Sequence, residues 1–411
     1  MPAPEAGSLF ANRVRGMEGS TIRELLKVNA RDTISLAGGY PSPESFPLAK
    51  INLLHQRIQS RPDYASSILQ YGPTEGLPEL LDVLPDFLSR ENRQVIATPE
   101  NIAITAGSQQ ALSILGMMLI NPGDEVAVES PTYLGALQAF SPCKPKYVEI
   151  ETDQDGIISS SLEQAFIDHP KIKFLYTIPT FQNPTGRTIP LERRQLIADI
   201  LKRHGKLAVE DDPYSELRYE GEPIPSIQSM APDNVIHLFT FSKTFAPDVR
   251  IGGMVGPKEF IEKANLIKQG TSLYTSNYNQ ALIYEYIKSG FLEEHLPEIV
   301  GLYRPKRDAM AQTITENFPE IFEFTLSKGG MFIWVKLKKE FEILSEKINI
   351  KDVLEEAKKN KVSFVPGAPF FAQTTGNEVA MRLNFTNQPV ENIVQAVRII
   401  GEILKQRLQV A

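Results

Sequence analysis

A single lysine, Lys243, stands at the end of an apolar run in the stretch NVIHLFTFSKTFAPDVRIGGMVG, residues 234–256. Lysine is rarely buried unless its charge is paired or neutralised. Lys243 could be a surface residue whose ammonium group reaches water. It could also be an amine that is partly withdrawn from water and thereby activated as a nucleophile. If Lys243 is an activated nucleophile, other reactive groups should lie near it.

Three other apolar runs lead into residues that suit a bound ligand. Ser108 and Gln109 follow the first run and open a helix, whose free backbone N–H groups suit a phosphate. Tyr133 follows the second run and could stack on a flat ring. Asn183 lies in an Asn-Pro-Thr-Gly turn after the third. Each also has an ordinary explanation, as a capped helix, a packing tyrosine or a simple turn.

Two further strand ends carry charged and hydroxyl groups. The run KLAVEDDPYSEL places three acids at residues 210–212 and a tyrosine at Tyr214. Such acids are usually solvated, but a carboxylate at this edge can keep a ring nitrogen protonated. Ser242 precedes Lys243, and Arg250 follows seven residues later. Together these groups meet the requirements of pyridoxal phosphate, which needs a lysine for its Schiff base and an acidic partner for its ring nitrogen.

The elements that carry these residues alternate between strand and helix from about residue 100. Apolar runs that predict strands lie at 101–105, 125–130, 146–150, 173–179, 206–212, 234–241 and 251–256. Helical spacing between the early runs predicts an α/β domain with a mainly parallel sheet flanked by helices. Ligands bind beyond the carboxyl ends of the strands in such sheets, so the candidate residues should meet at one edge.

The pattern changes after about residue 275 and predicts a smaller α+β domain. A long, interrupted helical stretch at 277–318 precedes a hairpin at 322–337, a helix at 351–360, two short runs and a last helix from residue 389. Near the N-terminus, Ser20 is a plausible N-cap for a short helix. We predict an N-terminal segment at 1–48 that joins the small domain, a large domain at 49–285 and a small domain at 286–411.

The bulk composition favours a soluble cytoplasmic protein. Of the 411 residues, 42% are hydrophobic and 23% charged, and the net charge of -7 does not favour a nucleic-acid partner. The single cysteine, Cys143, fits a reducing compartment. No apolar stretch reaches the length that spans a bilayer, and the five histidines show no metal-ligand spacing.

The chain resembles the fold-type I pyridoxal-phosphate aminotransferases of class I/II. The resemblance runs from about residue 20 to the end and is carried by AGGYPSPESFP, QYGPTEGLPEL, ITAGSQQAL, ESPTY, PTFQNPTG, EDDPYSEL, FSKTFAPDVRIG and RLNF. Three of these motifs, AGGYPSPESFP, GSQQAL and EDDPY, are most similar to the 2-aminoadipate and kynurenine aminotransferase branch. The resemblance implies the fold of that family and a homodimer with active sites at the interface.

The resemblance also implies roles for individual residues. Lys243 is the Schiff-base lysine and general base, Asp211 pairs with the ring nitrogen, and Tyr214 holds the ring hydroxyl together with Asn183. The other cofactor-binding residues are Ser108, Gln109, Tyr133, Ser242, Arg250 and, from the partner subunit, Tyr71. The substrate-binding residues are Arg382 for the α-carboxylate, Asn183, Gly39, Tyr71 and Arg23, with Tyr40 beside the side-chain pocket. Arg23 has an equally good reading as a solvated helix charge.

The implied reaction is transamination by ping-pong chemistry. An L-amino acid of the 2-aminoadipate, aromatic or kynurenine, or branched-chain type would give its amino group to a 2-oxo acid, expected to be 2-oxoglutarate. A racemase, decarboxylase or β-lyase would use the same lysine and ring site. A ligand-sensing transcription regulator is a further alternative, but it needs a DNA-binding domain ahead of residue 20, where the chain has too little length.

Overall fold

The seven apolar runs predicted as strands pair into one sheet in the computed structural model, which describes residues 9–14, 17, 19, 32–345, 347–374 and 378–410. The strands, in spatial order, are β2 (Ile102–Thr105), β10 (Gly252–Val255), β9 (Val235–Thr240), β8 (Leu207–Asp212), β7 (Ile172–Thr177), β3 (Glu125–Glu129) and β4 (Lys146–Ile150). All run parallel except β10, which is antiparallel to both neighbours. The prediction of a mainly parallel α/β sheet is confirmed.

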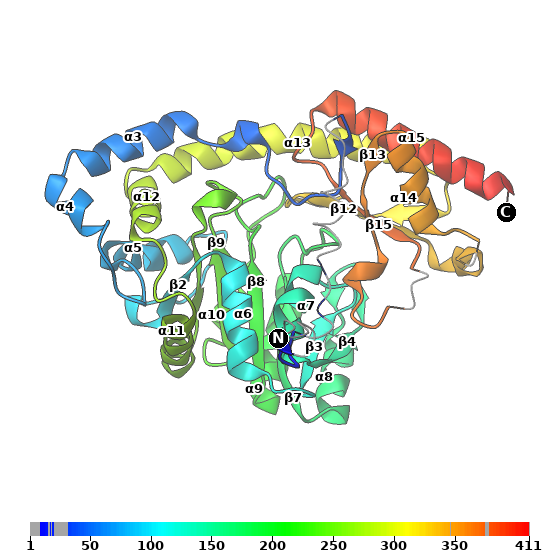
Figure 1. The fold of residues 1–411 in the computed structure, drawn as a ribbon. Coiled ribbons are helices and arrows are strands. Elements are labelled where there is room, and N and C mark those ends of the chain that lie inside the picture. The colour runs from blue at the N-terminus through cyan, green and yellow to red at the C-terminus, as the bar shows by residue number, and fades with distance from the viewer. Residues whose placement is uncertain are drawn as a thin grey trace, which may run out of the picture.

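Helices cover both faces of this sheet because successive strand residues point to opposite sides. In β3, for example, Val126 and Val128 pack on one face and Ala127 on the other. The first face is covered by α6 (Ser108–Leu119), α7 (Leu134–Phe140) and α11 (Lys258–Thr271). The second is covered by α8 (Ser159–Asp168), α9 (Leu191–His204), α10 (Ile227–Met230), α5 (Pro78–Leu88) and α12 (Asn277–Lys288) (Figure 1). The helix α3 (Leu48–Gln59) packs against α12 farther from the sheet.

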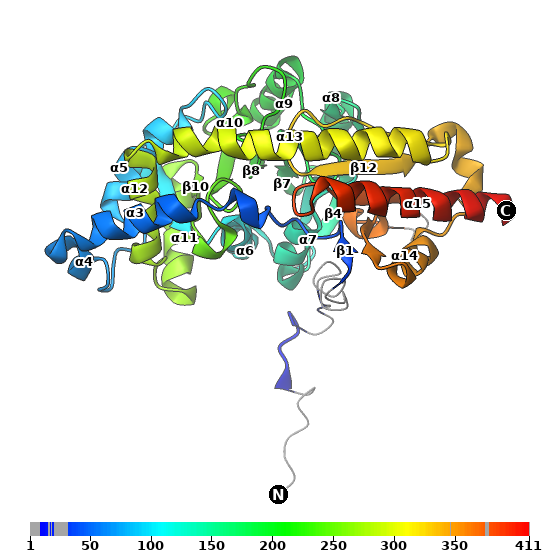
Figure 2. The same ribbon diagram turned by 90° about the horizontal axis from the view of Figure 1, so that it is seen from above.

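A second, smaller sheet follows in the C-terminal part of the chain. Its order is β11 (Phe322–Phe324), β12 (Phe332–Leu337), β15 (Ala380–Asn384) and β14 (Val365–Pro366), and all neighbours are antiparallel. The helices α13 (Phe291–Asn317), α14 (Ile350–Lys359) and α15 (Val390–Val410) share its core. Figure 2 shows α13 and α15 lying side by side. The predicted hairpin and helices are present.

The predicted interruption of the helical stretch at 277–318 is also present. It falls between α12 and α13, at Ser289 and Gly290. Gly290 has φ of +75°, a conformation that glycine adopts without the steric penalty of a side chain.

Residues 34–36 of the N-terminal segment lie beside the smaller sheet. The strand β1 (Ile34–Ser35) pairs in parallel with β13 (Val362–Ser363), and the Asn384 backbone N–H donates to the Leu36 carbonyl at 2.9 Å. Residues 36–40 therefore lie beside β15. The remaining short elements are α4 (Pro62–Ser67), β5 (Thr152–Asp153) and β6 (Gly156–Ile157).

Two expectations fall outside these observations. The helix predicted after Ser20, which includes Arg23, lies outside the described residues. The domain limits at residues 48 and 285 stay predictions. Among the residues that the structure describes, every helix is too short or too polar to cross a lipid bilayer.

Candidate active site

The acids at residues 210–212 take different positions because β8 alternates its side chains between the two faces of the sheet. Glu210 accepts hydrogen bonds from the Ile227 and Gln228 N–H groups at 3.0 and 2.9 Å. Asp212, on the same face, accepts a hydrogen bond from Arg93 Nη1 at 2.6 Å. Asp211 points to the opposite face. Because side chains alternate along a strand, Asp211 is the one of these three acids that lies on the face opposite to Glu210 and Asp212.

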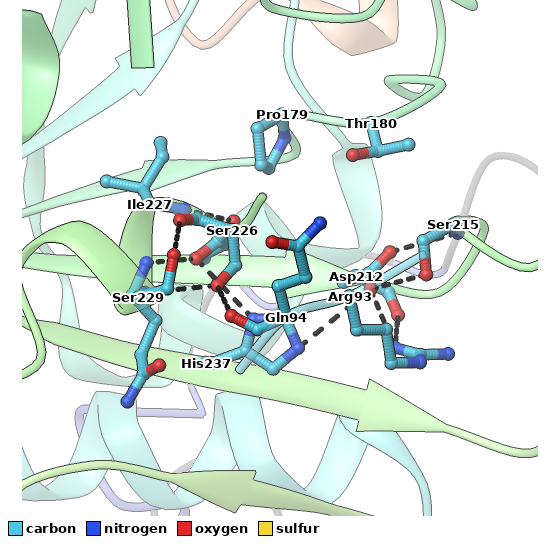
Figure 3. A network of polar contacts seen from close by, with 12 residues as sticks. Arg93, Gln94, Pro179, Thr180, Asp212, Ser215, Ser226, Ile227, Ser229 and His237 are labelled. Atoms are coloured by element: carbon cyan, nitrogen blue, oxygen red, sulfur yellow. Dashed lines mark hydrogen bonds and ion pairs between the residues drawn. The ribbon is translucent and has the colours of Figure 1, made fainter. Parts of the chain in front are cut away.

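The side chains around Asp212 form a buried polar network (Figure 3). Ser215 Oγ donates to Asp212 at 2.7 Å, and His237 lies 3.9 Å from the same carboxylate. Burial alone would raise the pKa of Asp212, but Arg93 beside it holds that pKa below its usual value. Hydrogen bonds from Arg93 and Ser215 thus satisfy both carboxylate oxygens of Asp212.

Asp211 has a different environment. The Tyr176 hydroxyl donates to Asp211 Oδ2 at 2.9 Å, whereas Oδ1 is buried with no hydrogen-bond partner among the described residues. Burial raises the pKa of Asp211 to about 7, against the effect of the Tyr176 hydrogen bond. A buried acceptor is costly to leave unpaired. Oδ1 therefore fits a ligand that donates a proton, such as a protonated ring nitrogen.

A second set of groups surrounds the N-terminus of α6. Ser108 opens the helix, and its hydroxyl is buried without a partner among the described residues. Gly107 before it has φ of +73°, and a Cβ there would lie 2.7 Å from Arg250 Nη2. Glycine therefore lets Arg250 approach the helix terminus. Free N–H groups, a hydroxyl and a guanidinium together suit a phosphate.

The direction of β10 explains why Arg250 reaches this edge. Because β10 is antiparallel, its first residue, Gly252, pairs with Thr105 and Thr240, the last residues of β2 and β9. Arg250 precedes that residue and donates to the Ala106 carbonyl at 2.6 Å. Ser242, after β9, accepts a hydrogen bond from Thr240 Oγ1 at 2.9 Å.

Lys243 lies at the same edge, close to the N-terminal segment. Its Nζ donates to the Gly39 carbonyl at 2.9 Å. Burial lowers the pKa of Lys243 to about 8, and the positive charges of Arg250 and Arg382 add to the shift. Near neutral pH the amine is therefore closer to its neutral, nucleophilic form than an ordinary lysine.

This pKa predicts how cofactor attachment depends on pH. Only the neutral amine attacks a carbonyl carbon, so below pH 8 the rate should rise about tenfold per pH unit and then level off. The measurement is the rate at which pyridoxal phosphate becomes attached to the cofactor-free protein, followed by absorbance between pH 6 and 10. A profile that keeps rising to pH 10 would show that Lys243 behaves as an ordinary lysine.

Arg382 lies on β15 and is buried, and its guanidinium group can bind an anion. Its Nη1 donates to Asn183 Oδ1 at 2.9 Å and its Nη2 to the Ala37 carbonyl at 2.7 Å. The guanidinium lies over the Phe332 and Phe370 rings, 4.1 and 5.1 Å from their centroids. Its Nε has no hydrogen-bond partner among the described residues. Burial lowers the pKa of Arg382 to about 10, so the group stays charged at neutral pH.

Aromatic side chains and glycines shape the space between these groups. The buried Tyr214 ring stands perpendicular to the Phe332 ring, with centroids 6.1 Å apart. Burial raises the pKa of Tyr214, so its hydroxyl keeps its proton. Tyr133 immediately precedes α7, and a Cβ on Gly135 would lie 2.3 Å from its ring. Gln109 donates to the Gly135 carbonyl at 3.0 Å.

The remaining candidates lie nearer the surface. Tyr71 is 76% exposed, and its ring packs edge-on against Tyr274 at 5.9 Å. Tyr40 is half-exposed, and its carbonyl accepts a hydrogen bond from Thr386 at 2.8 Å. A Cβ on Gly39 would lie 3.2 Å from the Phe332 ring, which leaves little room for any other residue. Arg23 lies outside the described residues.

Comparison with known proteins identifies the family. Residues 47–400 match the family model for aminotransferase class I and II, so this chain belongs to that family. It is 39% identical to aromatic-amino-acid aminotransferase 1 of Thermococcus litoralis, over 99% of this chain and 97% of that protein. It is 36% identical to 2-aminoadipate transaminase of Thermus thermophilus, over 96% of both.

A solved structure agrees with these sequence matches. It is that of Pyrococcus horikoshii kynurenine aminotransferase in complex with PMP, with a TM-score of 0.90 and 40% identity over 98% of each chain. The protein is therefore a pyridoxal-phosphate-dependent aminotransferase (EC 2.6.1.-) of fold type I, and both the predicted family and the predicted cofactor are confirmed. The roles of individual residues stay predictions.

Sequence reasoning missed several residues that shape the site. They are Tyr176 on Asp211, the two rings under Arg382, Phe332 and Phe370, and the Ala37 carbonyl. The apolar run KFLYTIP carried one signal, since a tyrosine inside a buried strand needs a partner for its hydroxyl. The Arg382 contacts join residues far apart in the chain, and we find no local signal for them.

Proposed function

We propose that this aminotransferase moves the amino group of an aromatic, kynurenine-type, 2-aminoadipate-type or branched-chain L-amino acid to 2-oxoglutarate. The observation that carries the proposal is the convergence of three groups, each fitted to one part of the reaction. Asp211 and Lys243 lie at one edge of the seven-stranded sheet, and Arg382 approaches Lys243 from β15 of the smaller sheet. The relatives named for aromatic amino acids, 2-aminoadipate and kynurenine support the donor classes. Arg382 fits the carboxylate that every donor and acceptor shares.

The cofactor would be held through its charged and polar groups. The buried Ser108 hydroxyl and the α6 N-terminus, with Ser242 and Arg250, would bind the phosphate. Asp211 Oδ1 would accept a hydrogen bond from the ring nitrogen. Tyr133 would stack on the ring, and Asn183 and Tyr214 would hold its hydroxyl. The buried atoms Ser108 Oγ and Asp211 Oδ1 have no hydrogen-bond partner in the described part of the chain, which is what a site built for this group requires.

The protein's own groups would then guide the proton. When bound, pyridoxal phosphate supplies a protonated ring that takes up the electron pair left by the departing α-proton. Lys243 Nζ accepts that proton as general base and later returns it, a role suited to a pKa of about 8. Asp211 keeps the ring nitrogen protonated. Arg382 fixes the α-carboxylate and thereby orients the α-proton towards Lys243.

Replacing Arg382 with lysine tests the carboxylate site. We expect Arg382→Lys to raise KM for the amino acid about 10- to 100-fold, because an ammonium group cannot make the paired hydrogen bonds of a guanidinium. The measurement is steady-state kinetics with each donor. The affinity for pyridoxal phosphate should change much less, which serves as the internal control. An unchanged KM would mean that the α-carboxylate of the substrate does not bind at Arg382.

We further propose a homodimer in which Tyr71 reaches the partner's cofactor phosphate. Tyr71, Leu69 and Leu273 are 76%, 72% and 48% exposed, an apolar surface of the kind that marks an interface. Twofold dimers are also the commonest oligomers. Sedimentation at assay concentration is the test, and a fully active monomer would contradict the proposal. A cytoplasmic location is proposed from the single free Cys143.

The substrate proposal is tested with a panel of donors. Tyrosine, kynurenine, 2-aminoadipate and leucine are each incubated with 2-oxoglutarate, and the new oxo acid and glutamate are quantified. We expect equal amounts of both products from at least one donor. Activity with other oxo acids but not 2-oxoglutarate would reject the proposed acceptor.

A further inference from the structure

A buried lysine outside the reaction chemistry, Lys268 on α11, has no evident role in binding either substrate. It is only 1% exposed. Burial lowers the pKa of Lys268 to about 8, although the negative charge of Glu75 works against that shift. Burying an ammonium group is expensive, and an apolar side chain of similar size avoids that cost. Lys268 therefore calls for an explanation from the contacts it makes.

The Lys268 ammonium group donates to two backbone carbonyls, those of Thr74 and Ile104. Ile104 lies in β2, an outermost strand of the seven-stranded sheet. Its outward N–H and carbonyl therefore have no neighbouring strand among the residues that the structure describes. The Ile104 N–H donates to the Glu75 carbonyl at 2.8 Å, and Thr275 Oγ1 lies 3.3 Å from the Ile104 carbonyl. Lys268 thus joins residues 74–75 to the edge of β2.

Both partners of Lys268 lie next to proposed phosphate-binding groups. The carboxyl end of β2 leads within four residues to Ser108. Thr74 is three residues after Tyr71. On the other side of Tyr71, Asn277 Nδ2 donates to the Gln70 carbonyl at 3.2 Å. The segment carrying Tyr71 is therefore anchored at both ends, with its exposed ring between the anchors.

We propose that Lys268 is a positioning residue that sets the place of Tyr71 relative to the sheet edge, and through it the phosphate affinity of the partner's site. The inference rests on the proposed homodimer, in which Tyr71 acts across the interface. A charged donor shared by two carbonyls makes stronger hydrogen bonds than a neutral one. It fixes the Tyr71 segment through two backbone carbonyls.

The test is a double-mutant cycle on cofactor affinity. Pyridoxal phosphate is titrated into the cofactor-free forms of the natural protein, Lys268→Met, Tyr71→Phe and the double variant. We expect Lys268→Met to weaken binding about tenfold in the natural background and less than about twofold in the Tyr71→Phe background. Lys206→Met is the matched control, because Lys206 also donates to two carbonyls, of Pro170 and Ile172, at the opposite end of the sheet.

Each other outcome overturns the inference. Equal weakening in both backgrounds would mean that Lys268 does not act through Tyr71, and no weakening would mean that it positions nothing. An unchanged affinity for pyridoxal phosphate in Tyr71→Phe would reject the proposed role of Tyr71 as well. The proposed functions of Lys243 and Asp211 do not depend on that result. If Lys268→Met does not fold, Lys268→Gln replaces it in the cycle, since its amide keeps an N–H donor of shorter reach.

Discussion

Lys243→Ala is expected to lower kcat by about 10⁴-fold or more, because the variant loses the proposed general base at the α-carbon. The variant should still bind pyridoxal phosphate, since the groups around Ser108, Arg250 and Asp211 remain. The measurement combines steady-state turnover with the release of the cofactor on denaturation. In the natural protein, the cofactor should be trapped on Lys243 by borohydride reduction.

Lys206→Ala provides the control for this variant. Lys206 is partly buried at the opposite end of the sheet, where it donates to the Pro170 and Ile172 carbonyls. Its loss should leave kcat within about twofold of the natural value. Substantial turnover by Lys243→Ala would refute the assignment of the reactive lysine.

Asp211→Asn is expected to slow removal of the α-proton by about 10²- to 10⁴-fold, because an amide cannot hold the ring nitrogen protonated. The variant keeps the size of the side chain and an acceptor for the Tyr176 hydroxyl. A single-turnover experiment with α-deuterated amino acid measures this step directly. The isotope effect should rise in the variant as proton removal becomes more strongly rate-limiting.

The Asp212→Asn variant distinguishes an effect on proton removal from an effect on protein stability. Asp212 is the neighbouring buried acid, but it pairs with Arg93 and Ser215 instead of facing the site. Its replacement should cost about 1–3 kcal/mol of stability, because Arg93 loses one of two buried acid partners and keeps Glu216. The proton-removal rate per folded site should change far less. Equal slowing in both variants would show that Asp211 has no special electronic role.

The sequence was most informative where a residue lies beside a strand end. Lys243, Asn183 and Ser108 could be placed because apolar runs and turn residues mark each strand, and parallel strands end at one edge. The three acids at 210–212 could not be told apart by composition. The family resemblance selected Asp211, and strand alternation explains why the two flanking acids turn away towards Arg93 and α10.

What sequence reasoning missed depends on contacts between distant residues. The antiparallel direction of β10 brings Arg250 to the phosphate edge, yet the run IGGMVG does not reveal its direction. The helices α3 and α5 were not predicted, and α5 contains Pro85, a residue that weakens a helical signal. The partners of Lys268 are 164 and 194 residues away in the chain. No local pattern encodes such pairs.

The central claim, that the protein exchanges amino groups through its bound cofactor, is tested most directly by one half of the reaction. Purified protein carrying pyridoxal phosphate is mixed with glutamate in the absence of any oxo acid, and its absorbance spectrum is recorded. We predict that the visible band of the bound cofactor gives way to the pyridoxamine band, with one 2-oxoglutarate released per active site. An unchanged spectrum with glutamate and with every donor of the panel would contradict the account.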